Sequence, residues 1–523
     1  MNRTSLYFLA ASIIYYLAFF EHYPRAGWAD AAIYNSYVFV GDSYQYIDGY
    51  GAALNGANYQ GSRLGYIGPL KFMGIFLGAS EARFAHNLIL YIIYCVSVLF
   101  ITEAFIVNLV GRVLITGFIL YNPMLVGSIV FGGSDGPAAI YSIASLALIY
   151  LSMRNRYYLI FSGAFLGLAI SSHIFSLLPY VIALSAILLK EDFHRRQMIR
   201  LYWREIIFFI LGLASVIFLF GTLGGYLGLK HFYLAYSSGR AEASMNGSGA
   251  NFSAPFIFEL RNAAPWIGIV LLSVCVFILR AMNAKGDQQR DNLLERRLAL
   301  YGLLTPLAFV LSFDFLIGGR LTTSPHYFVA FFPSFTIGLI YFLACWDQLV
   351  QSFSSKACLV VVISVNIFVI IQVPNNKYLF NAGKSSGDAL ISSQQALDRE
   401  ISGRINKSSF NIVYPAPEKI DLESEQYIDY YNGAERTFDY LDSLVFVFPW
   451  VGDKVFRINL SGLQAANFGP QYGLPIVFLG KDKSQIDKMR FKVGLNFPKD
   501  ALGDVTCGGA EKYKWCFLIV KNE

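Results

Sequence analysis

The amino-acid sequence predicts a polytopic α-helical membrane protein with a small α/β domain at its C-terminus. Three observations predict this fold class. Of the 523 residues, 55% are hydrophobic and only 15% are charged, which is typical of polytopic membrane proteins. Long apolar runs recur up to Val373-Pro374, and the sequence then becomes polar. We therefore divide the chain into a transmembrane domain, residues 1–373, and a soluble domain, residues 374–523.

The apolar runs predict about eleven transmembrane helices, because a hydrocarbon core about 30 Å thick needs about 20 apolar residues per helix. The runs lie near residues 5–20, 86–106, 113–131, 137–152, 158–171, 174–189, 206–228, 263–279, 298–316, 327–345 and 357–373. Runs 158–171 and 174–189 are short and are joined by Ser171-Ser172-His173. They form either a tight outer hairpin or one broken helix.

The positive charges predict the orientation, because Lys and Arg in short loops stay on the cytoplasmic side. With the N-terminus inside, clusters in residues 190–204 and 280–297 fall on the inner side, while the outer loops hold only scattered cations. The net charge of +6 is mostly a topology signal, so nucleic acid is not an expected partner. We expect a multi-pass protein of the bacterial inner membrane with a cytoplasmic N-terminus and an extracytoplasmic C-terminal domain.

The polar C-terminal region has the pattern of a small α/β domain. Residues 390–401 have helical spacing, and four short apolar runs read as buried strands: residues 410–414, 444–448, 475–479 and 516–520. Its only cysteines, Cys507 and Cys516, are close enough in sequence to form a disulfide in an oxidising compartment. The alternative is two unpaired thiols, which would also weaken the predicted orientation.

The outer face collects the polar residues that topology does not explain, beginning with Gly41-Asp42-Ser43-Tyr44 in a first outer loop of about residues 21–85. An acid beside hydrocarbon is expensive and is by default a functional hypothesis. Carboxylates and cations together can deprotonate a hydroxyl and neutralise a phosphate leaving group. The candidates are Asp30, Asp42, Asp48, Arg63, Asp135, His173, Lys230, Arg320 and His326.

Nucleotide and metal motifs are absent from the sequence. It contains no Gly-x-x-x-x-Gly-Lys-Ser/Thr loop and no zinc-ligand spacing of Cys and His. No cofactor is therefore predicted. Two acids could hold a divalent metal ion, but no carboxylate cluster has a compelling spacing for one.

Several of these motifs resemble the GT-C superfamily of integral membrane glycosyltransferases. Gly41-Asp42-Ser43-Tyr44-Gln45-Tyr46, Asn55-Gly56 and Arg63 before Pro69 resemble the first loop of the protein-mannosyltransferases and lipid A aminoarabinose transferases. Ser134-Asp135-Gly136-Pro137, the Gly163 to Ala169 run and His326-Tyr327 with Pro333 continue the resemblance. It covers roughly residues 1–345 as a layout with short motifs.

The resemblance implies an inverting transfer of a sugar from a polyprenyl-phosphate donor to an acceptor hydroxyl at the outer membrane face. Asp42 matches the first-loop acid of the family and would act as the general base. Cations would bind the donor phosphate, and the candidates are Arg320, His326, Arg63 and Lys230. The family usually has Arg where this chain has His326, so we favour Arg320, whose guanidinium can bind phosphate with two parallel bonds.

Each of the acids also has a structural interpretation. Asp42 could cap an interfacial helix, although the family layout favours catalysis. Asp30 is either a second acid that binds the acceptor or a capping residue. Asp135 before Pro137 has the usual pattern of a helix start, which is slightly favoured over a role as second acid. His173 in a tight turn is expected to be a hydrogen-bonded interface residue.

Two other functions remain open at the level of sequence. One is an O-antigen polymerase or ligase, which also handles polyprenyl-linked sugars but relies on outer-loop arginines. The other is a flippase for polyprenyl-linked sugars, but the two halves of the sequence show no convincing repeat. The expected acceptor is a surface glycan or lipid-linked glycan, as in lipopolysaccharide biosynthesis.

Overall fold

The structure, a computed structural model, describes two sets of elements in the chain. The longer described segments are residues 3–19, 63–105, 133–152, 155–173, 203–226, 386–405, 410–416, 427–431, 434–438, 451–459, 475–493, 503–510 and 513–520. Single residues or pairs are also described at 38, 116–117, 119–120, 129, 176–177, 180–181, 184, 441 and 444.

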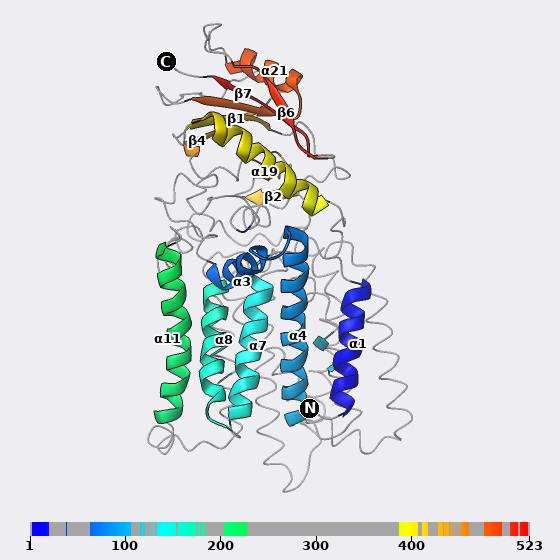
Figure 1. The fold of residues 1–523 in the computed structure, drawn as a ribbon, viewed down its shortest axis with the longest axis vertical. Helices are drawn as coiled ribbons and strands as arrows, with labels where there is room; N and C mark the ends of the chain where they lie inside the picture. Colours follow the sequence, from blue (N-terminus) through cyan, green and yellow to red (C-terminus); the bar gives the residue numbers. More distant parts are fainter. Residues whose placement is uncertain are drawn as a thin grey trace. The chain divides into compact units, whose positions relative to one another are not determined.

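The chain divides into two compact units. Five of the described helices lie wholly or mostly in the first unit: α1 (Arg3–Phe19), α4 (Ala79–Phe105) from Asn87 onward, α7 (Asp135–Ser152), α8 (Tyr158–Ser172) and α11 (Trp203–Tyr226) up to Phe220. The second unit contains α3 (Leu64–Gly74), the first two turns of α4, the last residues of α11 and the C-terminal domain. Figure 1 shows these elements. Four of the five helices match runs predicted to span the bilayer, and α4 begins seven residues before its run.

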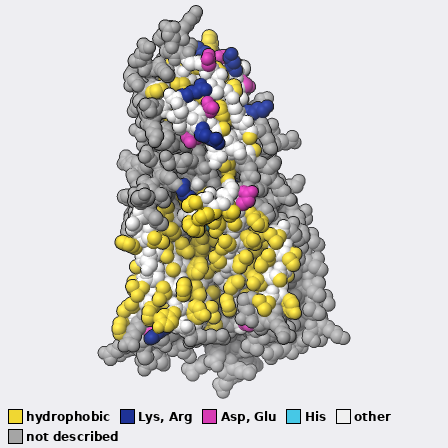
Figure 2. All heavy atoms as spheres, viewed as in Figure 1, with side chains coloured by type: hydrophobic (Ala, Val, Ile, Leu, Met, Phe, Trp, Pro, Cys, Tyr) yellow, Lys and Arg dark blue, Asp and Glu magenta, His cyan; other side chains and the backbone are white. Residues whose placement is uncertain are grey.

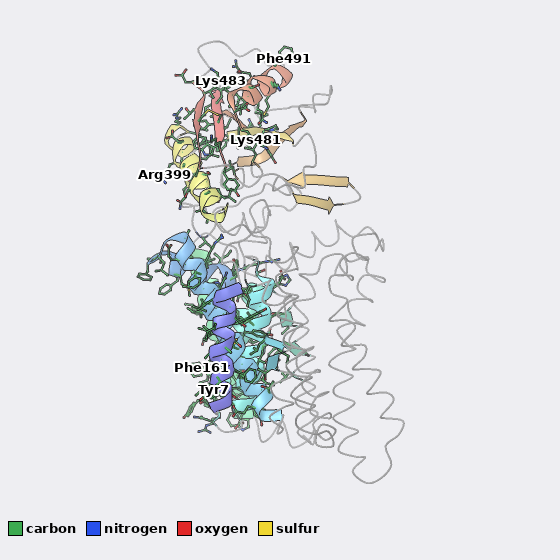
Figure 3. All side chains as sticks on the ribbon, turned by 90° about the vertical axis from the view of Figure 1, so that its right-hand side faces the viewer. Tyr7, Phe161, Arg399, Lys481, Lys483 and Phe491 are labelled. Carbon is green, nitrogen blue, oxygen red and sulfur yellow. A yellow bond between two sulfur atoms is a disulfide. The ribbon has the colours of Figure 1, made fainter. Side chains whose placement is uncertain are left out.

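The helices have the length and the surface of membrane spans. Residues Glu81–Glu103 and Asp135–Ser152 are long and apolar enough to cross a bilayer, and three shorter apolar helices accompany them. Tyr7 and Phe161 are 74% and 59% exposed and project outward from the helices (Figure 3). Figure 2 shows hydrophobic side chains covering the described helices on the face in view. Such a surface is unfavourable in water, and it identifies the helices as a membrane domain.

Helix α7 lies in the interior of this domain, and serine hydrogen bonds join it to α8. Every residue from Asp135 to Ala147 is buried. The hydroxyl of Ser162 donates to the backbone oxygen of Ser145 at 2.8 Å, and the hydroxyl of Ser145 donates to the backbone oxygen of Ser162 at the same distance. Interhelical hydrogen bonds of this kind stabilise packing in lipid, where burial of apolar surface supplies little driving force.

Helices α8 and α11 pack backbone against backbone through glycines. A Cβ atom added at Gly163 would lie 1.9 Å from the backbone oxygen of Phe209, and one at Gly212 would lie 1.9 Å from the backbone oxygen of Ile160. Two helices can approach this closely only where a side chain is missing. These two glycines therefore set the distance between α8 and α11.

The chain reverses direction at His173. Helix α8 ends at Ser172, His173 has an extended backbone, and helical residues resume at 176. The hydroxyl of Tyr180 lies 2.9 Å from that of Ser145, which is bonded to Ser162 in the middle of α8. At 1.5 Å per residue a continuing helix would carry Tyr180 roughly 27 Å beyond Ser162. The contact requires the chain to turn back, as in the hairpin alternative.

The C-terminal domain is a mixed sheet between helices. Its five strands have the order β4-β1-β5-β7-β6. Strands β4, β1 and β5 are parallel to one another, β7 is antiparallel to β5, and β6 is antiparallel to β7. The strands are β1 (Phe410–Ala416), β4 (Val451–Asn459), β5 (Ile476–Gly480), β6 (Thr506–Gly508) and β7 (Trp515–Val520). Strands β2 (Tyr427–Tyr431) and β3 (Ala434–Phe438) form a separate antiparallel pair.

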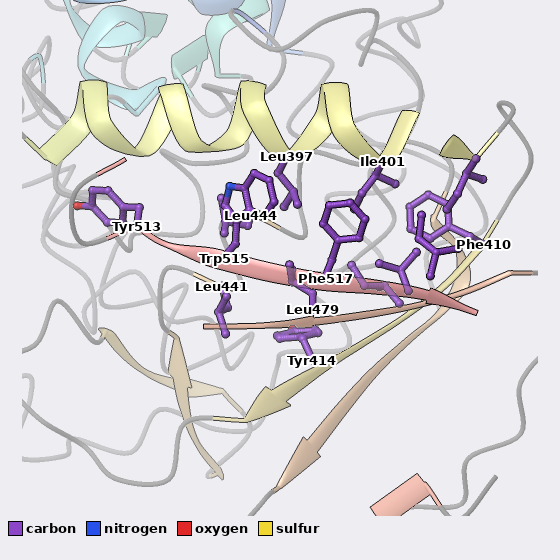
Figure 4. Close-up of a cluster of buried hydrophobic side chains, with 14 of the residues drawn as sticks. Leu397, Ile401, Phe410, Tyr414, Leu441, Leu444, Leu479, Tyr513, Trp515 and Phe517 are labelled. Atoms are coloured by element: carbon purple, nitrogen blue, oxygen red, sulfur yellow. The ribbon is translucent and has the colours of Figure 1, made fainter. Parts of the chain in front are cut away.

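Alternating side chains of the sheet form two cores. Phe410, Leu479 and Phe517 of the strands form one buried cluster with Leu397 of helix α19 (Ser386–Arg404) (Figure 4). The intervening residues of the same strands pack against helix α21 (Lys483–Val493) in a second cluster. The period of two along each strand therefore buries both faces of the sheet. The predicted α/β composition is correct.

The strand predictions differ from the structure at three places. Leu444, expected to begin a strand, is helical and buried in the core beside α19. Strand β4 was missed because polar residues interrupt its sequence Val-Gly-Asp-Lys-Val-Phe-Arg-Ile-Asn, and the pair β2 and β3 was not predicted either. Cys507 and Cys516 face each other on β6 and β7 and are joined by a disulfide.

Candidate functional site

Helix α3 shapes the described end of the first loop. Its first turn forms where the backbone oxygen of Arg63 accepts hydrogen bonds from the amides of Tyr66 and Ile67, both at 3.0 Å. Leu64, Ile67 and Leu70 lie on its buried side. No apolar period in the sequence is long enough to predict this helix, because it is 11 residues long and contains Pro69.

Buried polar side chains of α4 face helix α3. Arg83 and His86, one helical turn apart near the start of α4, are 4% and 2% exposed. The rings of Tyr66 and His86 meet edge to face, with centroids 5.6 Å apart. The nitrogens of the Arg83 guanidinium and of the His86 ring are all buried. We call Tyr66, Arg83 and His86 the α3–α4 cluster.

The charge of Arg83 reaches the hydroxyl of Tyr66. Burial raises the pKa of Tyr66 to about 12, and the positive charge of Arg83 acts in the opposite direction. The hydroxyl is therefore protonated at neutral pH and can donate a hydrogen bond. A buried guanidinium needs an opposite charge or strong acceptors around it. A cluster of this composition can bind an anion such as phosphate.

Sequence reasoning missed Arg83 and His86. The predicted apolar run begins at residue 86, so the prediction placed Arg83 in the first outer loop among its scattered cations. The available signal was the spacing Arg83-x-x-His86, which puts two polar side chains on one face of a helix. An arginine at a helix end would ordinarily reach out to water, whereas this one is buried.

A second buried polar group joins the start of α7 to the end of α8. Nε2 of His173 lies 3.2 Å from Oδ1 of Asp135, and the side chains are 2% and 10% exposed. Ser134 and Ser176 are buried as well. The backbone oxygen of Ser134 accepts from the amide of Ala138 at 3.1 Å, so Asp135 lies within the first turn. Its carboxylate, expected as a helix cap, instead contacts the imidazole of His173.

Three of the predicted site residues fall within the described segments. Arg63 directly precedes helix α3, and Asp135 forms the pair with His173. Among the described residues, no group of three or more His, Cys, Asp or Glu side chains is arranged to hold a metal ion. The remaining predicted residues lie outside the described segments: Asp30, Asp42, Asp48, Lys230, Arg320 and His326.

Comparisons with known proteins found a match among solved structures only. No family model matches the sequence, and no curated protein matches it. Among solved structures, the chain matches the crystal structure of ArnT from Cupriavidus metallidurans bound to undecaprenyl phosphate. The match covers 98% of this chain and 97% of ArnT, with 12% sequence identity and a TM-score of 0.47. ArnT is a GT-C lipid A aminoarabinose transferase.

Proposed function

We propose that the protein is an inverting glycosyltransferase that moves a sugar from a polyprenyl-phosphate donor to an acceptor hydroxyl at the outer membrane face. The observation that carries this proposal is the α3–α4 cluster. It buries Arg83 and His86 at the start of an apolar helix long enough to span a bilayer. A donor whose phosphate sits at the end of a polyprenyl chain would place its anion at that depth.

The reaction needs a base and a stabilised leaving group. In the proposed mechanism Asp42 accepts the proton of the acceptor hydroxyl as its oxygen attacks the anomeric carbon from the face opposite the phosphate. The bond from the sugar to the phosphate oxygen breaks, the phosphate takes the electron pair, and the configuration inverts. Arg63, Arg83 and His86 stabilise the negative charge that develops on the departing phosphate.

The other predicted residues complete this proposal. Arg320, His326 and Lys230 are proposed as further ligands of the donor phosphate, on the basis of the sequence. Asp135 is proposed as the second acid that binds the acceptor, with Asp30 as the alternative for this role. The acceptor is proposed to be a surface glycan or a lipid-linked glycan of the bacterial envelope.

A transfer assay with matched variants tests the proposal. Purified protein in lipid nanodiscs is incubated with a radiolabelled polyprenyl-phosphate sugar and a bacterial lipid-linked glycan. Asp42→Asn is expected to abolish transfer. Arg83→Met is expected to raise the donor KM by about 10- to 100-fold, because a hydrogen bond to a charged group contributes about 1.5–3 kcal/mol. Full transfer by Asp42→Asn would refute the base assignment.

A binding measurement separates the phosphate site from the chemistry. Undecaprenyl phosphate without a sugar serves as the probe, and its Kd is measured for wild type and Arg83→Met. The control is Arg156→Met, which removes an arginine that instead stacks on the rings of Tyr157 and Phe208, 5.8 Å from each centroid. We expect weaker binding only for Arg83→Met. Equal binding by both variants would exclude the α3–α4 cluster as the phosphate site.

A further inference from the structure

The Asp135–His173 pair lies in the interior of the membrane domain. Asp135 is the first residue of α7, a helix that is buried through Ala147, and His173 directly follows the last residue of α8. Oδ1 of Asp135 is buried, while the side chain as a whole keeps 10% of its exposure. The accessible part of the side chain is therefore the part that does not contact His173.

Both helix dipoles favour the ionised form of this pair. The N-terminus of a helix stabilises a carboxylate, and the C-terminus stabilises a protonated imidazole. Asp135 lies at the N-terminus of α7, and His173 follows the C-terminus of α8. The antiparallel arrangement of the two helices thus places the carboxylate at a helix N-terminus and the imidazole at a helix C-terminus, side by side.

The packing of α7 against α8 does not require this pair. Helices α7 and α8 are already joined by the reciprocal hydrogen bonds between Ser145 and Ser162. A buried ion pair adds little net stability, because the desolvation of two charges offsets most of their attraction. Two apolar side chains could join the same ends of α7 and α8. An ionisable pair at the end of a membrane helix therefore points to a function of the carboxylate.

We infer that His173 is a positioning residue, which holds Asp135 through Oδ1 and directs the rest of its carboxylate toward the acceptor sugar. This role rests on the proposed function, in which Asp135 is the acid that binds the acceptor. His173 does not touch the reacting atoms. Its contribution is to fix the rotamer and the charge of Asp135, and so the orientation of the acceptor hydroxyl.

The test uses the different reach of two amides. Glutamine places its side-chain nitrogen close to the position of Nε2 of histidine, whereas asparagine places its nitrogen close to that of Nδ1. His173→Gln therefore keeps a donor for Oδ1 of Asp135, while His173→Asn keeps the polarity without the reach. His173→Leu removes both. The control is Ser172→Ala, because the Ser172 hydroxyl donates within its own helix to the backbone oxygen of Leu168 at 2.8 Å.

We expect His173→Gln and Ser172→Ala to keep kcat within a few-fold of wild type. His173→Asn and His173→Leu are expected to lower kcat by about 10- to 100-fold, the scale of a misplaced substrate group, with the donor KM unchanged. Thermal unfolding midpoints are measured in parallel. A purely structural tie would lower the midpoint and would not separate Gln from Asn in kcat, and that result would overturn the inference.

A double-mutant cycle isolates the route through Asp135. If His173 acts only by positioning that carboxylate, His173→Asn will not lower kcat further in an Asp135→Asn background. Additive losses would overturn the positioning role. The outcome for wild type separates the two proposals. An inactive wild type overturns the proposed function and this role together, whereas an active wild type with an equally active His173→Leu overturns only the role of His173.

Discussion

The close contact between α8 and α11 gives the sharpest prediction for the stability of the membrane domain. We predict that Gly163→Ala destabilises this domain although it adds a single methyl group. The added Cβ would lie 1.9 Å from the backbone oxygen of Phe209 and 2.8 Å from the backbone nitrogen of Leu213. Backbone atoms cannot rotate away as the end of a side chain can. The two helices must therefore move apart.

The size of the effect follows from the geometry. Real Cβ contacts essentially never fall below 3.0 Å, so α8 and α11 must separate locally by at least about 1.1 Å. A gap of 0.5–1 Å already forfeits about a quarter to a half of the dispersion energy of each contact. Overpacking of this kind typically costs about 1–3 kcal/mol. Because packing is the main force between helices in lipid, its loss at this contact lowers the stability of the helix pair directly.

The assay is the midpoint of thermal unfolding in one detergent, measured alongside matched controls. Gly403→Ala in α19 adds the same methyl group where nothing lies within 4 Å, and it should not lower the midpoint. Gly212→Ala introduces an equivalent clash, 1.9 Å from the backbone oxygen of Ile160. Because both changes separate the same helices, the double variant should lose less than the sum of the two losses. A midpoint for Gly163→Ala equal to that of wild type would refute the close approach.

Three further predictions concern other parts of the protein. In intact cells an impermeant thiol reagent should label Cys507 and Cys516 only after reduction, and labelling without reduction would contradict the pairing. Removing the disulfide should destabilise the C-terminal domain by about 2–3 kcal/mol. Ser145→Ala should cost about 0.6–1.7 kcal/mol of stability in detergent, whereas Ser215→Ala should cost less, because Ser215 bonds only within its own helix to a backbone oxygen at 2.7 Å. The pKa of Tyr66 is raised to about 12, so its stabilising contribution should be present below about pH 10 and lost between about pH 10 and 12; an unchanged alkaline unfolding curve for Tyr66→Phe would contradict this.

The helices that could be predicted were those with a single physical requirement. A span must be apolar over its whole length, so α1, α7, α8 and α11 were visible as hydrophobic runs. Helix α3 is partly buried, short and interrupted by Pro69. Its formation depends on contacts with α4 such as that between Tyr66 and His86. A sequence window contains no information about such a contact.

The C-terminal sheet shows the same division between central and peripheral strands. Strands β1, β5 and β7 are buried on both faces and appear in the sequence as continuous apolar runs. Strand β4 lies at the edge of the sheet, where polar residues are tolerated, so no apolar run marks it. The strand predicted from Leu444 onward was wrong for a different reason. A short apolar run can be a strand or one turn of a helix, and only packing decides between them.

The candidate site shows why single residues are harder to predict than spans. Taken alone, Asp135 had the pattern of a helix start and His173 that of a turn residue, and both interpretations describe their local backbone correctly. Their contact depends on the antiparallel packing of α7 and α8, which brings residues 38 positions apart to 3.2 Å. Sequence alone left open whether the chain reverses at Ser171-Ser172-His173 or continues. The reversal at His173 that places Tyr180 beside Ser145 also leaves the imidazole at the helix end where Asp135 begins α7. The contact of Tyr180 with Ser145 therefore depends on the reversal, whereas the pair depends on the antiparallel packing of α7 and α8.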